Sequence, residues 1–146
     1  MRGGCCGGFI DISQNAKRVL LIGTFTTGAS QFHVQDDRMQ ILAEGKIQKF
    51  IKGCDQITFC SQFAGPQGQE VFYITERCVF KLSDGKLELI GVAPGIDLEK
   101  DILGHMEFRP VIRQVAPMDP RLLGILGAGA LSIKTIRPCG FLAICD

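Results

Sequence analysis

The chain has 146 residues, of which 46% are hydrophobic and 21% are charged, and its formal net charge at pH 7 is +1. This length corresponds to about one ordinary domain, and the apolar share is enough for a buried core, which excludes a disordered chain. The basic residues are scattered and form no stripe, which argues against a nucleic-acid-binding surface.

The cysteine content indicates reduced thiols. The sequence has seven cysteines and no Cys-x-x-Cys pair, and we see no secretory leader, so a cytoplasmic protein is favoured over a disulfide framework. Zinc needs four ligands at workable spacing, which the adjacent Cys5 and Cys6 and the isolated His33 and His105 do not provide. No apolar run reaches the roughly 20 residues of a membrane span. We expect no metal site and mostly buried, inert cysteines.

The segment "GGCCGGFIDISQNA" (3–16) opens the chain with four glycines. Glycine permits positive φ and lets a ligand approach the backbone closely. There is no GxGxxG or Walker lysine pattern, so a phosphate loop is not indicated. A nucleophilic Cys5 or Cys6 would need a base, and neither histidine is visibly linked to them. From these residues alone, a frayed terminus and a ligand-facing loop both remain open.

Strand patterns follow. The apolar run "RVLLIGTFT" (18–26) predicts a strand buried on both faces. Residues 31–35 and 39–44 alternate in polarity around "DDR", which predicts a β-hairpin. Residues 56–64 form a further candidate strand, which ends at the glycines and proline that follow.

The middle of the chain predicts more sheet. Residues 70–82 are rich in strand-forming side chains and predict two strand segments with an irregularity at 75–77. The turn "SDG" (83–85) then leads into residues 86–93, which pair back as a hairpin.

Glu76 lies in the irregular part of that region. A partly buried carboxylate there could act as a nucleophile or a base. The alternative that we favour is structural: an ion pair with Arg77, or a carboxylate that accepts hydrogen bonds from backbone amides.

A short helix is predicted after residue 96. Asp97 fits an N-cap, and the acidic residues that follow suit the positive end of the helix dipole. We expect the helix to end near Phe108, before Pro110. The apolar stripe on its buried side consists of Leu98, Ile102 and Met106. Beyond residue 110 the periodicity dissolves, and the elements together predict one strand-rich α/β domain.

Four segments carry a family likeness in order along the chain: "GGFIDISQNAKRVLLIGTFT" (7–26), "EGKIQKFIKGCDQITF" (44–59), "VFYITERCVFKL" (71–82) and "LELIGVAPGIDLEKDIL" (87–103). They resemble successive blocks of the carboxy-terminal part of the family I coenzyme A transferases. The likeness is greatest to the single-chain short-chain acyl-CoA type, which includes propionate, acetate and acetoacetate CoA-transferases. It extends from about Gly7 to about Arg121, where "PMDPRLL" (117–123) resembles the closing segment of the family.

The resemblance implies a division of the chain and a fold. Residues 1–121 would form a CoA-transferase carboxy-terminal domain, and residues 122–146 a divergent apolar tail. The fold implied is an α/β, strand-rich CoA-transferase-type sheet with flanking helices, incomplete at its amino-terminal side. In the full enzymes two such halves pack face to face, and the active site lies between them.

The resemblance also implies a reaction. The family moves coenzyme A between short-chain carboxylic acids: a glutamate attacks the acyl-CoA and, after exchange through a mixed anhydride, carries the CoA as glutamyl-CoA. CoA is a substrate, and no metal or redox cofactor is needed. In the family the nucleophilic glutamate lies upstream of the glycine segment with which this chain opens. We therefore expect no catalytic residue in this chain and an inactive isolated chain.

The glycine segment does match the family. The implied role of Gly7 and Gly8 is to present backbone amides to the CoA or the acyl oxygen, with Phe9 packing beside them. The adjacent Cys5 and Cys6 depart from the small residues more usual there.

The implied partners are acyl-CoA, a short-chain carboxylate, and an amino-terminal half or companion subunit in a homo- or hetero-oligomer. An alternative from another class is a non-catalytic acyl-CoA-binding or subunit-interaction module on the same fold. Which acid is preferred does not follow from the sequence.

Overall fold

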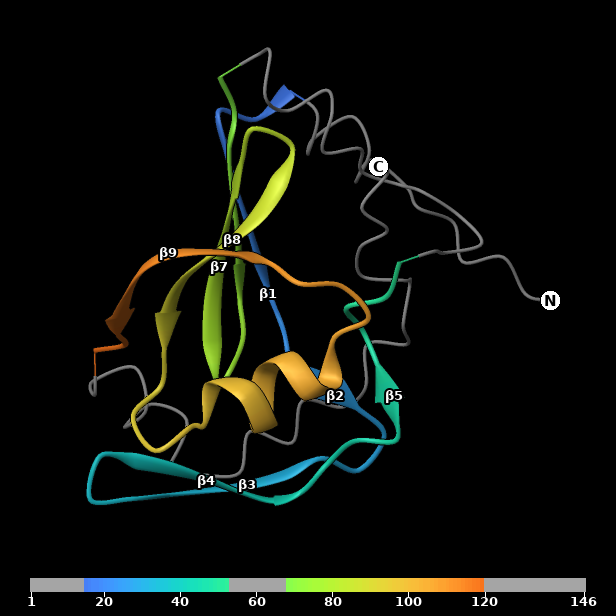
Figure 1. Cartoon of the computed structure of the whole chain (residues 1–146), viewed down its shortest axis with the longest axis vertical. Helices are drawn as coiled ribbons and strands as arrows, with labels where there is room; N and C mark the ends of the chain where they lie inside the picture. The colour runs from blue at the N-terminus through green and yellow to red at the C-terminus, as the bar shows by residue number, and fades with distance from the viewer. Residues whose placement is uncertain (1–14, 53–67, 120–146) are drawn as a thin grey trace, which may run out of the picture.

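The computed structural model describes residues 15–52 and 68–119 of the chain (Figure 1). Its main element is a five-stranded sheet in the order β1-β6-β7-β8-β9. The strands are β1 (Arg18–Ile22), β6 (Glu70–Ile74), β7 (Cys78–Ser83), β8 (Lys86–Val92) and β9 (Val111–Pro117). The two outer pairs, β1 with β6 and β8 with β9, are parallel, whereas β7 is antiparallel to both its neighbours.

Smaller elements lie beside this sheet. The strand β2 (Thr26–Thr27) pairs with β5 (Ile47–Gln48), and β3 (Gln31–Gln35) pairs with β4 (Arg38–Ala43). In Figure 1 the β3–β4 hairpin extends beneath the five-stranded sheet, and a short helical segment lies between the two. This segment consists of the π turn η1 (Leu98–Ile102) and the 3-10 turn η2 (Leu103–His105).

The strand-rich mixed sheet agrees with the predicted class, but the expected flanking helices are not seen in the described part of the chain beyond this one short segment. Within residues 15–52 and 68–119, no helix has the length and apolar character needed to cross a bilayer. The predicted strand at 56–64 and the tail at 122–146 lie outside the described residues, so the boundary at residue 121 stays a prediction.

The first strand differs from its prediction. The strand β1 ends at Ile22, and only one of its faces is buried: Val19 is 9% exposed, whereas Leu20 and Ile22 are 53% and 71% exposed. The expectation of a strand buried on both faces is therefore wrong. Because an apolar run does not reveal whether a second layer is present, it could not distinguish a covered strand from this one at the end of the sheet.

The predicted turns are confirmed, and each has a local cause. The β3–β4 turn has positive φ at Asp36 and Asp37, as the tight hairpin turn that matches strand twist requires. The β7–β8 turn places Asp84 and Gly85 in the same region of φ. The predicted irregularity between β6 and β7 is a reversal closed by the amide of Thr75, which donates to the Cys78 carbonyl.

The predicted helix start is confirmed, but the helix type and end differ. Asp97 accepts a hydrogen bond from the Lys100 amide at 2.8 Å, and Asp101 reaches back to the Asp97 amide at 2.9 Å, which forms a reciprocal cap. The Leu103 amide donates to the Leu98 carbonyl, which widens the turn to a π helix. The helical segment ends at His105 instead of near Phe108, directly after Gly104, which disfavours continuation.

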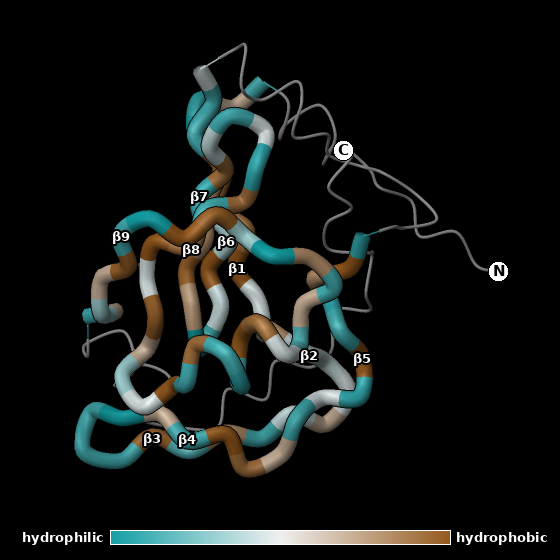
Figure 2. The backbone as a smooth tube through the Cα atoms, in the orientation of Figure 1, coloured by the Kyte–Doolittle hydropathy of each residue, from teal (hydrophilic) through white to brown (hydrophobic). Residues whose placement is uncertain are grey.

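The main core lies on one face of the sheet. Phe25 and Phe50, from the connection between β1 and β6, pack with their ring centroids 4.8 Å apart, and Phe50 lies 5.1 Å from Phe80 on β7. Ile102 of η1 is fully buried in the same cluster. Figure 2 shows hydrophobic segments along the central strands and a hydrophilic turn at the end of the β3–β4 hairpin.

Candidate functional site

The predicted ligand-binding residues Gly7, Gly8 and Phe9 lie outside the described residues, so their role stays a prediction. The described part offers two other places where functional chemistry could be sought. One is a buried ionic cluster around Arg77, and the other is an open pocket beside the helical segment.

Glu76 has a structural position. Its side chain is 4% exposed, and its Oε2 accepts a hydrogen bond from the Phe25 amide at 2.7 Å. Its Oε1 accepts from Nε of Arg77 at 3.1 Å. Burial raises the pKa of Glu76, and the Arg77 charge and the backbone amides offset only part of this effect. Both favoured structural roles, the ion pair and the amide acceptor, are confirmed, and neither oxygen is placed to attack a substrate.

Arg77 is the centre of the cluster. Its side chain is 1% exposed, and its Nη1 donates to Glu44 at 2.7 Å and to the Asp101 carbonyl at 2.8 Å. Its guanidinium also lies 4.7 Å from the ring centroid of Phe25, a cation–π distance. Burial alone would lower the pKa of Arg77, but its hydrogen bonds and its two carboxylate neighbours raise it, so the guanidinium is charged. Arg77 thus joins the β6–β7 turn to η1 and to the end of β4.

Glu44 completes this connection. It accepts a hydrogen bond from the Thr26 hydroxyl at 3.0 Å, and the Thr26 hydroxyl accepts in turn from the Gly45 amide. His105 Nε2 lies 3.6 Å from its Oε1. Burial alone would raise the pKa of Glu44, but the hydrogen bond and charge of Arg77 outweigh burial and lower it. Glu44 could not be identified from the sequence, because a lone glutamate after a strand gives no signal of a partner 33 residues away.

The remaining candidate nucleophiles and bases do not assemble with this cluster. Cys78 is buried and free, and burial raises the pKa of its thiol, so the reactive thiolate is disfavoured. His33 is exposed on β3. Within the ranges that the structure describes, no group of metal-ligating side chains comes together. The cluster is therefore suited to holding elements in place, not to catalysis.

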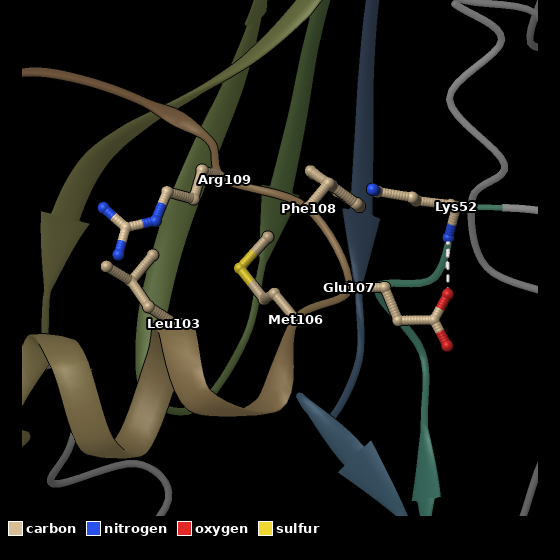
Figure 3. Close-up of a pocket in the computed structure, with 6 residues that line it drawn as sticks. All are labelled: Lys52, Leu103, Met106, Glu107, Phe108 and Arg109. Atoms are coloured by element: carbon tan, nitrogen blue, oxygen red, sulfur yellow. Dashed lines mark hydrogen bonds between the residues drawn. The ribbon is translucent and has the colours of Figure 1, made fainter.

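The pocket has a different character (Figure 3). It has a volume of about 450 Å³ and is lined by Lys52, Leu103, Met106, Glu107, Phe108 and Arg109. In Figure 3 the cationic side chains of Arg109 and Lys52 lie on either side of the apolar Met106 and Phe108. The Glu107 carboxylate accepts from the Lys52 amide at 2.9 Å, so the pocket carries one acid beside its two cations. An apolar floor between two cations is suited to an apolar group that carries negative charge.

Comparison with known proteins gives relatives of one kind, although no protein-family model matches the chain. The chain is 46% identical over 117 residues to the acetate CoA-transferase YdiF of Escherichia coli K12, which covers 80% of this chain and 22% of that protein. It is 45% identical over 106 residues to the caffeate CoA-transferase of Acetobacterium woodii. This match covers 73% of this chain and 20% of that protein. The chain thus spans about a fifth of the length of the curated relatives it matches.

Solved structures agree with these relatives. The apoenzyme of the acyl-CoA transferase YdiF from Escherichia coli O157:H7 superposes with a TM-score of 0.77 over 80% of this chain and 23% of that chain. The thioester complex of the same enzyme with CoA gives 0.76, again at 46% identity. The described strands therefore reproduce part of a known CoA-transferase structure.

Proposed function

Because the chain is homologous to a segment of the family I coenzyme A transferases, we propose that it forms the carboxy-terminal segment of an enzyme that exchanges CoA between short-chain carboxylic acids. The observation that carries this proposal is the 46% identity to acetate CoA-transferase over 117 residues, together with the matching strand arrangement. Acetate is the substrate named for that relative, which supports a short-chain acid here, whereas the similarly identical relative from Acetobacterium woodii is named for caffeate, a larger aromatic acid.

In the proposed reaction, a glutamate carboxylate attacks the acyl-CoA carbonyl and releases the CoA thiolate, which leaves a mixed anhydride. The thiolate then attacks the glutamyl carbonyl and releases the first carboxylic acid as its carboxylate. The resulting glutamyl-CoA reacts with a second carboxylate by the reverse steps. We place the nucleophile outside this chain. Five of the six glutamates support this, since each already interacts with a cation or amide of this chain: Glu44, Glu70, Glu76, Glu88 and Glu107. The sixth, Glu99, is exposed in the first turn of η1, and for it the family resemblance alone supports this placement.

The contribution of this chain would be binding and positioning. Gly7 and Gly8 would present backbone amides to the thioester or its oxyanion, since a side chain there would block the approach of the ligand, and Phe9 would pack beside them. The active unit would be residues 1–121, with residues 122–146 as a separate apolar tail. The seven cysteines support a cytoplasmic location.

The test is reconstitution with a companion polypeptide, for which we choose the Escherichia coli acetate CoA-transferase without the segment that this chain matches. The mixture is given acetyl-CoA and propionate, and propionyl-CoA is measured by mass spectrometry. We expect exchange with both polypeptides and none with either alone. Replacing Gly8 by asparagine should abolish exchange, whereas Gly68→Asn should not, because an added Cβ at Gly68 meets no atom within 4 Å and asparagine tolerates its φ of +66°. A folded complex that produces no propionyl-CoA would contradict the proposal.

The non-catalytic acyl-CoA-binding or interaction module is the second candidate, and the pocket between Lys52 and Arg109 favours it. Calorimetric titration of the chain alone with acetyl-CoA distinguishes the two. The module would be supported if the chain binds acetyl-CoA, if Arg109→Ala weakens that binding, and if the reconstituted mixture shows no exchange. Exchange that survives Arg109→Ala would support the transferase segment.

A further inference from the structure

The face of the five-stranded sheet opposite the main core carries an apolar patch. The side chains of Leu20 and Ile22 on β1 are 53% and 71% exposed. In the parallel pairing, Leu20 lies beside Phe72 and Ile22 beside Ile74, both half-buried on β6. Single exposed apolar residues are ordinary, but four at paired register positions form a continuous surface. We refer to these four residues as the β1–β6 patch.

The charged residues that border the patch interact with one another. Arg18 Nε donates to the Glu70 carboxylate at 2.8 Å, and Lys81 Nζ lies 3.7 Å from the same carboxylate. Lys81 also lies 5.6 Å from the ring centroid of Phe72. Because the two cations share one carboxylate, the border keeps a single net positive charge and does not call for a strongly charged partner. The chemistry of the patch fits an apolar surface.

The sheet topology indicates what kind of element is missing. All-parallel sheets are almost always covered on both faces, usually by helices, and β1 with β6 is a parallel pair at the end of this mixed sheet. The core face is covered by Phe25, Phe50 and Ile102. Over the patch, the described residues supply no helix, since η1 directs Ile102 into the core on the other face. An amphipathic helix is the element that such a face ordinarily packs against.

The length of the relatives indicates where that helix comes from. The chain covers 22% of acetate CoA-transferase and 23% of its solved chain, so most of that protein lies outside the matched segment. We infer that the β1–β6 patch is the docking surface for the part of the transferase that this chain does not span, which covers it with the apolar side of a helix. This inference rests on the proposed function and names its partner and the point of contact.

The test compares two pairs of exposed apolar residues. Leu20→Glu with Ile22→Glu alters the patch. Leu42→Glu with Ile47→Glu is the matched control, since those side chains are 64% and 51% exposed on β4 and β5. The full-length chain is titrated with the truncated Escherichia coli acetate CoA-transferase described above, and binding is followed by sedimentation velocity. We expect the patch variant to bind at least about tenfold more weakly and the control to bind like the unaltered chain.

Circular dichroism and the unfolding midpoint show whether both variants keep the fold, as exposed positions should allow. No binding by the unaltered chain, or equal binding by the patch variant, would overturn the inference. A homodimer of the chain alone that the patch variant abolishes would identify a second copy as the occupant instead. Binding that appears only after removal of residues 122–146 would identify the chain's own tail.

The two proposals fail in different ways. A complex that needs the patch but produces no propionyl-CoA contradicts the proposed function and leaves the docking surface standing. The opposite result is an exchange rate that the patch variant does not reduce, measured at companion concentrations near the dissociation constant. It contradicts the docking surface and leaves the proposed function standing.

Discussion

Arg77 holds together the turn between β6 and β7, the end of β4 and the helical segment. Removing a buried cation leaves Glu76 without its main partner in a place where the unpaired carboxylate is costly. We therefore predict that Arg77→Met lowers the free energy of unfolding by about 4 kcal/mol. Denaturant unfolding followed by circular dichroism measures this change.

The matched control for that substitution is Arg18→Met. Arg18 also pairs with a glutamate, but its side chain is 64% exposed, so the pair is screened by water. We expect its unfolding midpoint to stay close to that of the unaltered chain. Equal losses in the two variants would show that burial does not set the strength of the Arg77 cluster.

Glu44 makes stability depend on pH in a defined direction. Its pKa in the fold lies below the ordinary value of 4.5, so between these two values the unfolded chain binds more protons. The stability that Glu44 contributes is therefore complete above pH 4.5 and is lost as the pH falls through the folded pKa. Glu76 has a raised pKa, so above its ordinary value its effect on stability has the opposite sign and stability falls as the pH rises. This effect is present both in the unaltered chain and in the Glu44 variant described next.

The variant Glu44→Gln isolates this effect, because the contribution of Glu76 largely cancels in the difference. We predict that the variant is less stable than the unaltered chain above pH 4.5 and that the difference narrows in more acidic solution. Urea unfolding at a series of pH values measures it. A difference that stays constant through the acidic range would show that Glu44 is not held by Arg77.

At the scale of elements, the contact between β4 and the segment after β8 depends on Gly95. Its φ is +92°, and an added Cβ would lie 2.6 Å from the Met39 carbonyl oxygen. The Met39 amide donates to the Pro94 carbonyl at 2.8 Å, so the two backbones are already in contact. Gly95→Ala would therefore combine backbone strain with a clash.

We predict a loss of about 3 kcal/mol for Gly95→Ala in the same unfolding measurement. The control is Gly85→Ala, which has a similar φ of +73° but no atom within 4 Å of the added Cβ. It should cost only the strain, about 1 kcal/mol. If the two variants lose the same free energy of unfolding, the close approach of Gly95 to Met39 does not contribute to the cost of the substitution.

Features with a local cause were predictable from the sequence. The turns at Asp36 and Asp84 and the cap at Asp97 depend on residues within four positions, so their signals lie in short windows. The exposure of Ile22 depends on which layers cover the sheet, and the Glu44–Arg77 contact joins residues 33 positions apart. Neither feature produces a periodic pattern in the sequence. Gly7 and Gly8 were identified through family resemblance and lie outside the described residues.

At the scale of the molecule, the chain holds a mixed sheet with one well-packed face and one face that carries the β1–β6 patch. Such a sheet is suited to being one layer of a larger protein. This agrees with a chain that spans about a fifth of its relatives. In the proposed enzyme, this chain supplies binding amides and a packing surface, and the companion polypeptide supplies the nucleophile.

The most direct test of this division follows the covalent intermediate. The chain and the truncated acetate CoA-transferase are mixed, given acetyl-CoA without an acceptor acid, and analysed by mass spectrometry of each polypeptide. The account predicts CoA bound as a thioester to a glutamate of the companion, formed only when this chain is present. CoA bound to a glutamate of this chain, or formed on the companion equally well in its absence, would contradict it.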